Sequence, residues 1–179
     1  MNKNELIEQL HSALNNFVFG IALRCNFPPS LWPQIINAQL EFGNKEQAII
    51  KLAPLINRLS DEQDRQHLFD EYEKSLKRSL IREGHELILN YCKESNQLPL
   101  YKSQTWFLFA RILRNIVSHK DCGILREWPK DLTKSSVKQV QWRIRIIDDS
   151  MVGCAVDFTP YEAIQLFDDQ MSFVQSKLA

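Results

Sequence analysis

The stretch that decides the fold is residues 61–95, DEQDRQHLFDEYEKSLKRSLIREGHELILNYCKES. It contains no proline, and its apolar side chains recur at intervals of four and seven residues: Leu68, Tyr72, Leu76, Leu80, Leu87 and Tyr91. This spacing predicts one unusually long amphipathic helix. The polar run 60–63 supplies a cap and an acidic first turn for it, and Gly84 marks a point where the helix could be interrupted.

Residues on the N-terminal side of this stretch also repeat with a helical period. A first helix is expected from the N-terminus to about residue 26, where Pro28 and Pro29 stop it. A second is expected from a Ser30 cap through Leu40 to residue 43. A third is expected from about residue 44 to residue 55, with a kink or break at Pro54.

On the C-terminal side the period changes once. A helix is expected over about 102–120, followed by an exposed connection over 121–136. Apolar and polar residues then alternate over 138–158 on both sides of a turn candidate at 148–150, which predicts a β-hairpin. Thr159, Pro160 and Glu162 then predict the start of a last helix. The fold class is therefore mainly α: one helical domain over 1–179, with a hairpin appendage at about 138–158 before the C-terminal helix.

Composition indicates an ordinary globular protein. The chain has 179 residues, 44% of them hydrophobic and 25% charged, with a formal net charge of zero. No apolar run approaches the length of about 20 residues that a membrane helix needs, so a cytoplasmic protein without membrane contact is expected. The charge is unevenly spread: residues 71–146 carry 15 Lys or Arg and 8 Asp or Glu. This basic middle segment could meet a polyanion, or it could pair with the acidic ends of the chain.

Several kinds of catalytic site are not supported by the sequence. With only five glycines the chain has no glycine-rich phosphate loop, and it has neither an HExxH nor a GxSxG motif. Its four cysteines form no CxxC pair and have no histidine at zinc-site spacing, so reduced thiols are expected. Neither a metal nor a cofactor is therefore predicted.

The segment Arg111–Lys120, RILRNIVSHK, carries the one motif with a chemical rationale. Arg114 and His119 are separated by four residues, and the polar Asn115 follows the arginine. This pattern resembles the signature of the HEPN family, helical-bundle proteins that are common in defence and toxin–antitoxin systems. Many of them are metal-independent endoribonucleases.

The resemblance implies roles for five residues of this segment. His119 would transfer protons, because a histidine can act as base or acid near neutral pH. Arg114 would hold the phosphoryl oxygens with its permanently charged fork, and Asn115 would position them by hydrogen bonding. Arg111 and Lys120 would bind the RNA substrate.

The spacing also bears on assembly, since a five-residue step turns about 140° around an ideal helix. One straight helix would not aim Arg114 and His119 at the same phosphate. Either the helix ends or distorts near Ser118, or two helices from two chains meet. The second option matches the HEPN pattern, in which a homodimer joins two copies of the motif in one cleft. The resemblance also implies that an antitoxin protein could hold the enzyme inactive.

Two alternatives remain open at this stage. Arg78 and His85 also fit the motif, with six residues between them and the polar Ser79 after the arginine. The whole chain could instead be a non-catalytic helical module that binds a protein or a nucleic acid through its basic middle segment.

Overall fold

The structure, a computed structural model, describes all residues except 27, 32–33, 35, 38, 43–47 and 119–122. The chain divides into two compact units, which are described separately below. The larger unit consists of Met1–Val18 and Leu76–Ala179, and the smaller unit is Phe19–Ser75. The single domain expected from the sequence stays a prediction.

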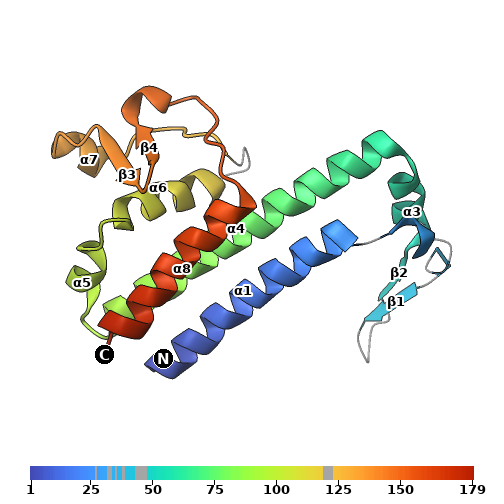
Figure 1. Ribbon diagram of the computed structural model, residues 1–179, viewed down its shortest axis with the longest axis horizontal. Coiled ribbons are helices and arrows are strands. Elements are labelled where there is room, and N and C mark those ends of the chain that lie inside the picture. The colour runs from blue at the N-terminus through green and yellow to red at the C-terminus, as the bar shows by residue number, and fades with distance from the viewer. Residues whose placement is uncertain (27, 32–33, 35, 38, 43–47, 119–122) are drawn as a thin grey trace. The chain divides into compact units, whose positions relative to one another are not determined.

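Helices dominate the described residues (Figure 1). The α-helices are α1 (Lys3–Asn26), α3 (Ala53–Ser60), α4 (Glu62–Glu94), α5 (Leu98–Lys102), α6 (Phe107–Ser118), α7 (Lys130–Lys134) and α8 (Pro160–Lys177). Two short 3-10 turns cover Pro29–Leu31 and Asp149–Met151. The strands are β1 (Gln39–Phe42), β2 (Ala48–Lys51), β3 (Gln139–Trp142) and β4 (Arg145–Asp148). The predicted class, mainly α with a β-hairpin before the C-terminal helix, is confirmed.

The long helix of residues 61–95 is confirmed as α4. The Asp61 carboxylate accepts a hydrogen bond from the backbone N–H of Asp64 at 2.9 Å and so caps its first turn. The helix continues through Gly84 without a break. The close packing of α8 explains why a glycine stands in this helix: a β-carbon at position 84 would lie 2.9 Å from Gln170 Oε1 and 3.0 Å from Phe167 Cδ2.

Replacing Gly84 by alanine is expected to lower the free energy of unfolding by about 1 kcal/mol. Overpacking a tight site costs about 1–3 kcal/mol, and the better helix propensity of alanine offsets about 1 kcal/mol of that loss. Urea denaturation of the full chain measures the change. Asn90→Ala, on the exposed face of the same helix, is the control and should be neutral or slightly stabilising. A Gly84→Ala protein at least as stable as the wild type would contradict the close packing.

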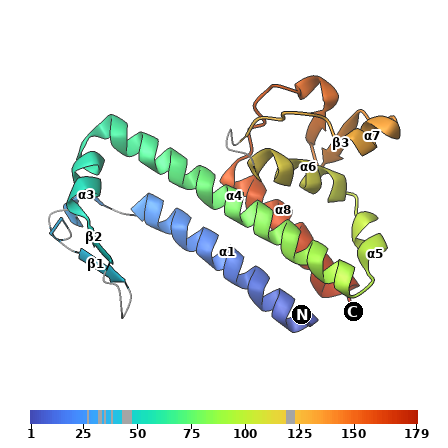
Figure 2. The same cartoon turned by 180° about the vertical axis from the view of Figure 1, so that it is seen from behind.

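The larger unit is built around α4, with α8 and the first turns of α1 beside it (Figure 1; Figure 2). Lys3 Nζ donates to the backbone carbonyl of Leu178 at 2.6 Å, which ties the two ends of the chain together. The predicted start of α8 is confirmed as a capping box, in which Thr159 Oγ1 accepts from the Glu162 N–H and the Glu162 carboxylate accepts from the Thr159 N–H.

Aromatic side chains fix α5 and α6 on this frame. Tyr101 of α5 is fully buried, and its ring centroid lies 5.0 Å from that of Phe107 in α6. Further along α6, Phe109 packs on Trp142 of β3 with 5.6 Å between ring centroids. Seven α6 side chains are buried: Phe107, Phe109, Ala110, Ile112, Leu113, Ile116 and Val117. One face of α6 is thereby held against the core, and its other face is left for the site.

The C-terminal hairpin lies earlier in the sequence than predicted. Trp142 pairs with Arg145, and the chain turns at Arg143 with a positive φ of 52°. Ile144, which continued the alternating pattern, is 92% exposed at this turn. The predicted turn at 148–150 overlaps a 3-10 turn instead. The predicted second strand at 152–158 was wrong, because within it only Ala155 pairs, in an isolated bridge with Ile124.

The smaller unit differs from the prediction more strongly. The helices expected over 30–43 and from 44 onward were wrong where the structure describes them, because β1 and β2 form an antiparallel hairpin in which Leu40 lies opposite Ile50. The short apolar run Ala48-Ile49-Ile50, with its two β-branched residues, is compatible with a strand as well as with a helix. Pro54 does not kink a helix but lies in the first turn of α3, where its missing N–H costs nothing.

No helix among the described residues is long and apolar enough to cross a membrane.

Candidate functional site

Helix α6 carries Arg111, Arg114 and Asn115 on the face that turns away from the core. The three residues are spaced at i, i+3 and i+4, so they are neighbours on one side of the helix. Each of them is half-buried, whereas Ile112 and Leu113 between them are fully buried. The packing of α6 therefore brings together three of the residues predicted from the motif.

The Arg114 guanidinium is held from two directions. Its Nη2 lies 2.5 Å from Glu86 Oε1 of α4, and its Nη1 donates to Asn115 Oδ1 at 3.1 Å. Glu86 also meets Arg82 Nε at 3.7 Å, one turn earlier on α4. A charge-assisted bond between partly buried groups restricts the guanidinium more than an exposed pair would. Arg114 is thus a positioned cation rather than a solvated one.

Arg111 has one partner and an unused edge. Its Nη1 lies 2.9 Å from Asp131 Oδ2 of α7, and this hydrogen bond lowers the pKa of the Asp131 carboxyl. Its Nε and Nη2 atoms are buried and have no hydrogen-bond partner among the described residues. Buried donors without acceptors are unfavourable by about 1–3 kcal/mol each. The Arg111 fork is consequently short of an acceptor in this conformation.

His85 of α4 lies in the core beneath these arginines and is only 3% exposed. Its Nδ1 is 2.9 Å from the Tyr101 hydroxyl. Burial lowers the pKa of His85 to about 4, and the nearby charges of Arg114 and Arg111 act in the same direction, against Glu86. His85 is therefore neutral at physiological pH. The alternative Arg78/His85 pair stays untested, but this environment favours a structural role for His85.

A pocket of about 410 Å³ opens beside Arg114, between α4, α5, α6 and the start of α7. Four cationic side chains line it: Lys93, Lys102, Arg111 and Arg114. Asp131 is the acidic residue in its lining. Cations gathered around a hollow raise the local concentration of anions such as phosphate. The arrangement is suited to binding a phosphate-bearing ligand.

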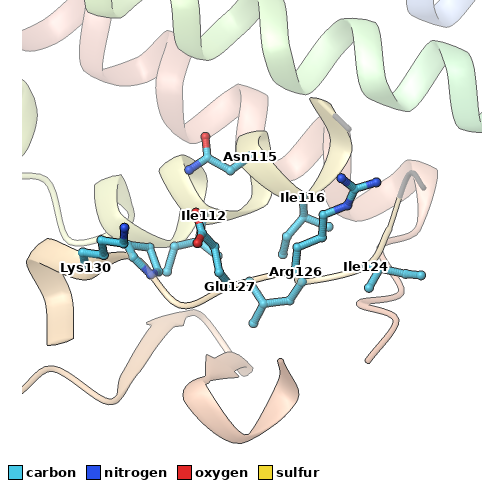
Figure 3. A pocket seen from close by; sticks show the side chains of 9 residues that line it. Ile112, Asn115, Ile116, Ile124, Arg126, Glu127 and Lys130 are labelled. Carbon is cyan, nitrogen blue, oxygen red and sulfur yellow. The ribbon is translucent and has the colours of Figure 1, made fainter. Parts of the chain in front are cut away.

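A second pocket, of about 340 Å³, shares Asn115 and Pro129 with the first. Ile112, Asn115 and Ile116 of α6 line it, together with Arg126, Glu127 and Lys130 of the segment that passes below the helix in Figure 3. Asn115 and its neighbour Arg114 thus stand between two hollows that both carry basic residues. A chain of phosphates could occupy both sides of this point.

The remaining motif residues are not placed. His119 and Lys120, predicted as proton-transfer and substrate-binding residues, lie outside the described residues. Lys93, Lys102 and Asp131 were not predicted as site residues, because they reach the pocket only through the packing of α5 and α7 on α6. The sequence signal closest to them was the basic composition of residues 71–146.

In the parts of the chain that the structure describes, no group of three or more His, Cys, Asp or Glu side chains is arranged to hold a metal ion.

No protein-family model matches the chain, and no curated protein or solved structure matches it. The geometry around Arg114 and the motif resemblance therefore carry the functional argument.

Proposed function

We propose that the chain is a metal-independent endoribonuclease of the HEPN type, with Arg114, Asn115 and His119 as its catalytic residues. The observation that carries this proposal is the Arg114 guanidinium, which Glu86 and Asn115 hold at the edge of a cation-lined pocket. Cleavage of RNA builds negative charge on the phosphoryl oxygens in the transition state. A cation that is already oriented stabilises this charge without reorganisation.

The reaction is a transesterification within the RNA chain. The 2′-oxygen attacks the adjacent phosphorus, the bond from phosphorus to the 5′-oxygen breaks, and a 2′,3′-cyclic phosphate and a 5′-hydroxyl form. His119 takes the proton from the 2′-hydroxyl or delivers one to the leaving 5′-oxygen. Arg114 binds the phosphoryl oxygens, Asn115 hydrogen-bonds to them, and Arg111 and Lys120 hold the flanking RNA.

The partners follow from the same resemblance. A homodimer would bring the two copies of the motif into one cleft. Such an enzyme would be toxic to its own cell unless restrained. A role as a defence or toxin–antitoxin effector, restrained by an antitoxin protein, is therefore part of the proposal.

The 179-residue chain is expected to cut single-stranded RNA in the presence of a chelator and to leave single-stranded DNA of the same sequence intact. DNA resists because it has no 2′-hydroxyl to act as the nucleophile. A panel of end-labelled RNA and DNA strands separated by gel electrophoresis is the measurement. His119→Ala should lose this cleavage. His67→Ala, which removes a histidine from the exposed side of α4, is its matched control and should cut like the wild type.

The second candidate is a binding module without catalysis. The four cations around the larger pocket favour it independently of His119, because they would attract RNA whether or not it is cut. Folded wild-type protein that binds RNA but leaves every strand of the panel uncut would establish this function in place of the first.

A further inference from the structure

The lining of the larger pocket is of two chemical kinds. Four of its side chains are cationic, Lys93, Lys102, Arg111 and Arg114, and others are apolar, among them Leu89, Leu98 and Phe107. Its volume of about 410 Å³ lies within the range of about 300–1,000 Å³ of pockets that bind small molecules. A nucleotide offers a partner for each kind, a flat base whose faces pack on apolar and aromatic side chains and a phosphate that binds cations.

Arg111 has the most unused binding capacity among the cationic side chains of the pocket, since two of its nitrogens lack a partner among the described residues, against the Nε atom alone of Arg114. Its Nε and Nη2 atoms form the edge of the guanidinium that binds two oxygens of one phosphate at once. Both atoms are buried and lack an acceptor among the residues that the structure describes. Arg111 would gain two acceptors if it turned this edge toward a phosphate in the pocket.

Asp131 is the group that holds Arg111 in its present orientation. Its carboxylate lies 2.9 Å from Arg111 Nη1, and its side chain is 63% exposed. A carboxylate offers two oxygens to a guanidinium much as a phosphate does. Turning the Nε–Nη2 edge toward a phosphate would break the contact between Nη1 and Asp131. Phosphate and Asp131 would therefore compete for Arg111, and the exposed Asp131 side chain could move into solvent.

We propose that this pocket binds one nucleotide of the RNA, next to the phosphate that is cut, and that Asp131 holds Arg111 turned away from this phosphate when the pocket is empty. Arg111, Lys93 and Lys102 bind the phosphate, and the apolar side chains of the lining contact the base. The assignment of the ligand as RNA rests on the proposed function. The pocket itself, including the competition by Asp131, rests on the contacts above.

The test measures binding of uridine 3′-monophosphate to the full chain by isothermal titration calorimetry. Arg111→Gln is expected to weaken binding by about 10-fold or more, since hydrogen bonds to charged groups contribute about 1.5–3 kcal/mol. Asp131→Asn is expected to tighten binding several-fold. Glu127→Gln is the matched control, because it makes the same change of charge four residues earlier, in the lining of the other pocket. Equal tightening by both variants, or no loss in Arg111→Gln, would overturn the proposal.

Two further probes separate this inference from the proposed catalysis. Uridine and inorganic phosphate each carry one half of the ligand, so both should bind more weakly than the nucleotide; equal affinity of phosphate and nucleotide would refute a nucleotide pocket. None of these measurements requires cleavage. Nucleotide binding that responds to Asp131→Asn as expected, in a protein that cuts no RNA, would support the pocket while removing the nuclease proposal.

Discussion

Arg114→Ala is expected to lower the rate of RNA cleavage by about 10²-fold or more, the loss typical when one positioned donor to a transition-state charge is removed. The effect should fall mainly on kcat, because the guanidinium meets the phosphoryl oxygens most strongly as their charge grows. Arg114→Lys should recover only part of the activity, since an ammonium keeps the charge but lacks the planar fork. Single-turnover cleavage of one RNA, at saturating enzyme, measures all three proteins.

Arg82→Ala is the control for this variant. Arg82 and Arg114 share Glu86 as a partner, at 3.7 Å and 2.5 Å respectively, so each substitution removes one cation beside the same carboxylate. The Arg82 side chain is more exposed than that of Arg114 and should be dispensable for cleavage. If Arg82→Ala and Arg114→Ala lost equal activity, Arg114 would be contributing only general positive charge.

The second large effect concerns stability in acid. The pKa of His85 is about 4 in the folded chain and about 6.5 in an unfolded one. Between these values the unfolded state binds the proton and the folded state does not, so acid favours unfolding. As the pH falls through this window, His85 alone should lower the free energy of unfolding by about 3 kcal/mol in total. Above the unfolded pKa this group adds nothing to the pH dependence of stability.

Urea denaturation at about pH 7 and about pH 4.5 tests this expectation in wild type and in His85→Gln. Glutamine cannot take up the proton, so the variant should lose about 2–3 kcal/mol less than the wild type over the same interval. Its stability at neutral pH should be lower, because the Tyr101 hydroxyl loses its imidazole partner. His67→Gln, on the exposed surface of α4, should keep the wild-type difference. A His85→Gln protein with the wild-type dependence would show that His85 is not a buried neutral group.

The parts of the fold that could be predicted were those in which local signals agree. The period of residues 61–95, a cap within 60–63 and the Thr159 capping box each depend on neighbours within a few residues, and all three are present. The two hairpins show the limit of this approach. The alternation of apolar and polar residues continues through Ile144, although the chain turns there. The turn is visible only in the structure, from the positive φ of Arg143 and the exposure of Ile144. The β1–β2 hairpin has a residue pattern that a helix shares.

The site divides in the same way. Arg111, Arg114 and Asn115 could be predicted to share a face because they lie on one helix at fixed spacing. Glu86 and Lys93 of α4 come close to them because helices pack together. Contacts between helices have no fixed separation in the sequence, so no residue pattern predicts them. The burial of His85 likewise depends on Tyr101 and Phe107, whose rings lie within 6 Å of its own. His119 and Lys120 remain predictions from the motif.

The chemical identity of the cleaved RNA ends tests the central claim most directly. Wild-type protein, in chelator, should convert one single-stranded RNA into fragments that mass spectrometry identifies as a 2′,3′-cyclic phosphate and a 5′-hydroxyl. A single 2′-deoxy nucleotide on the 5′ side of the cut should block that cut, and His119→Ala and Arg114→Ala should each leave the RNA intact over the same time. Fragments that carry a 5′-phosphate, or undiminished cyclic-phosphate products from His119→Ala, would contradict cleavage by Arg114 and His119.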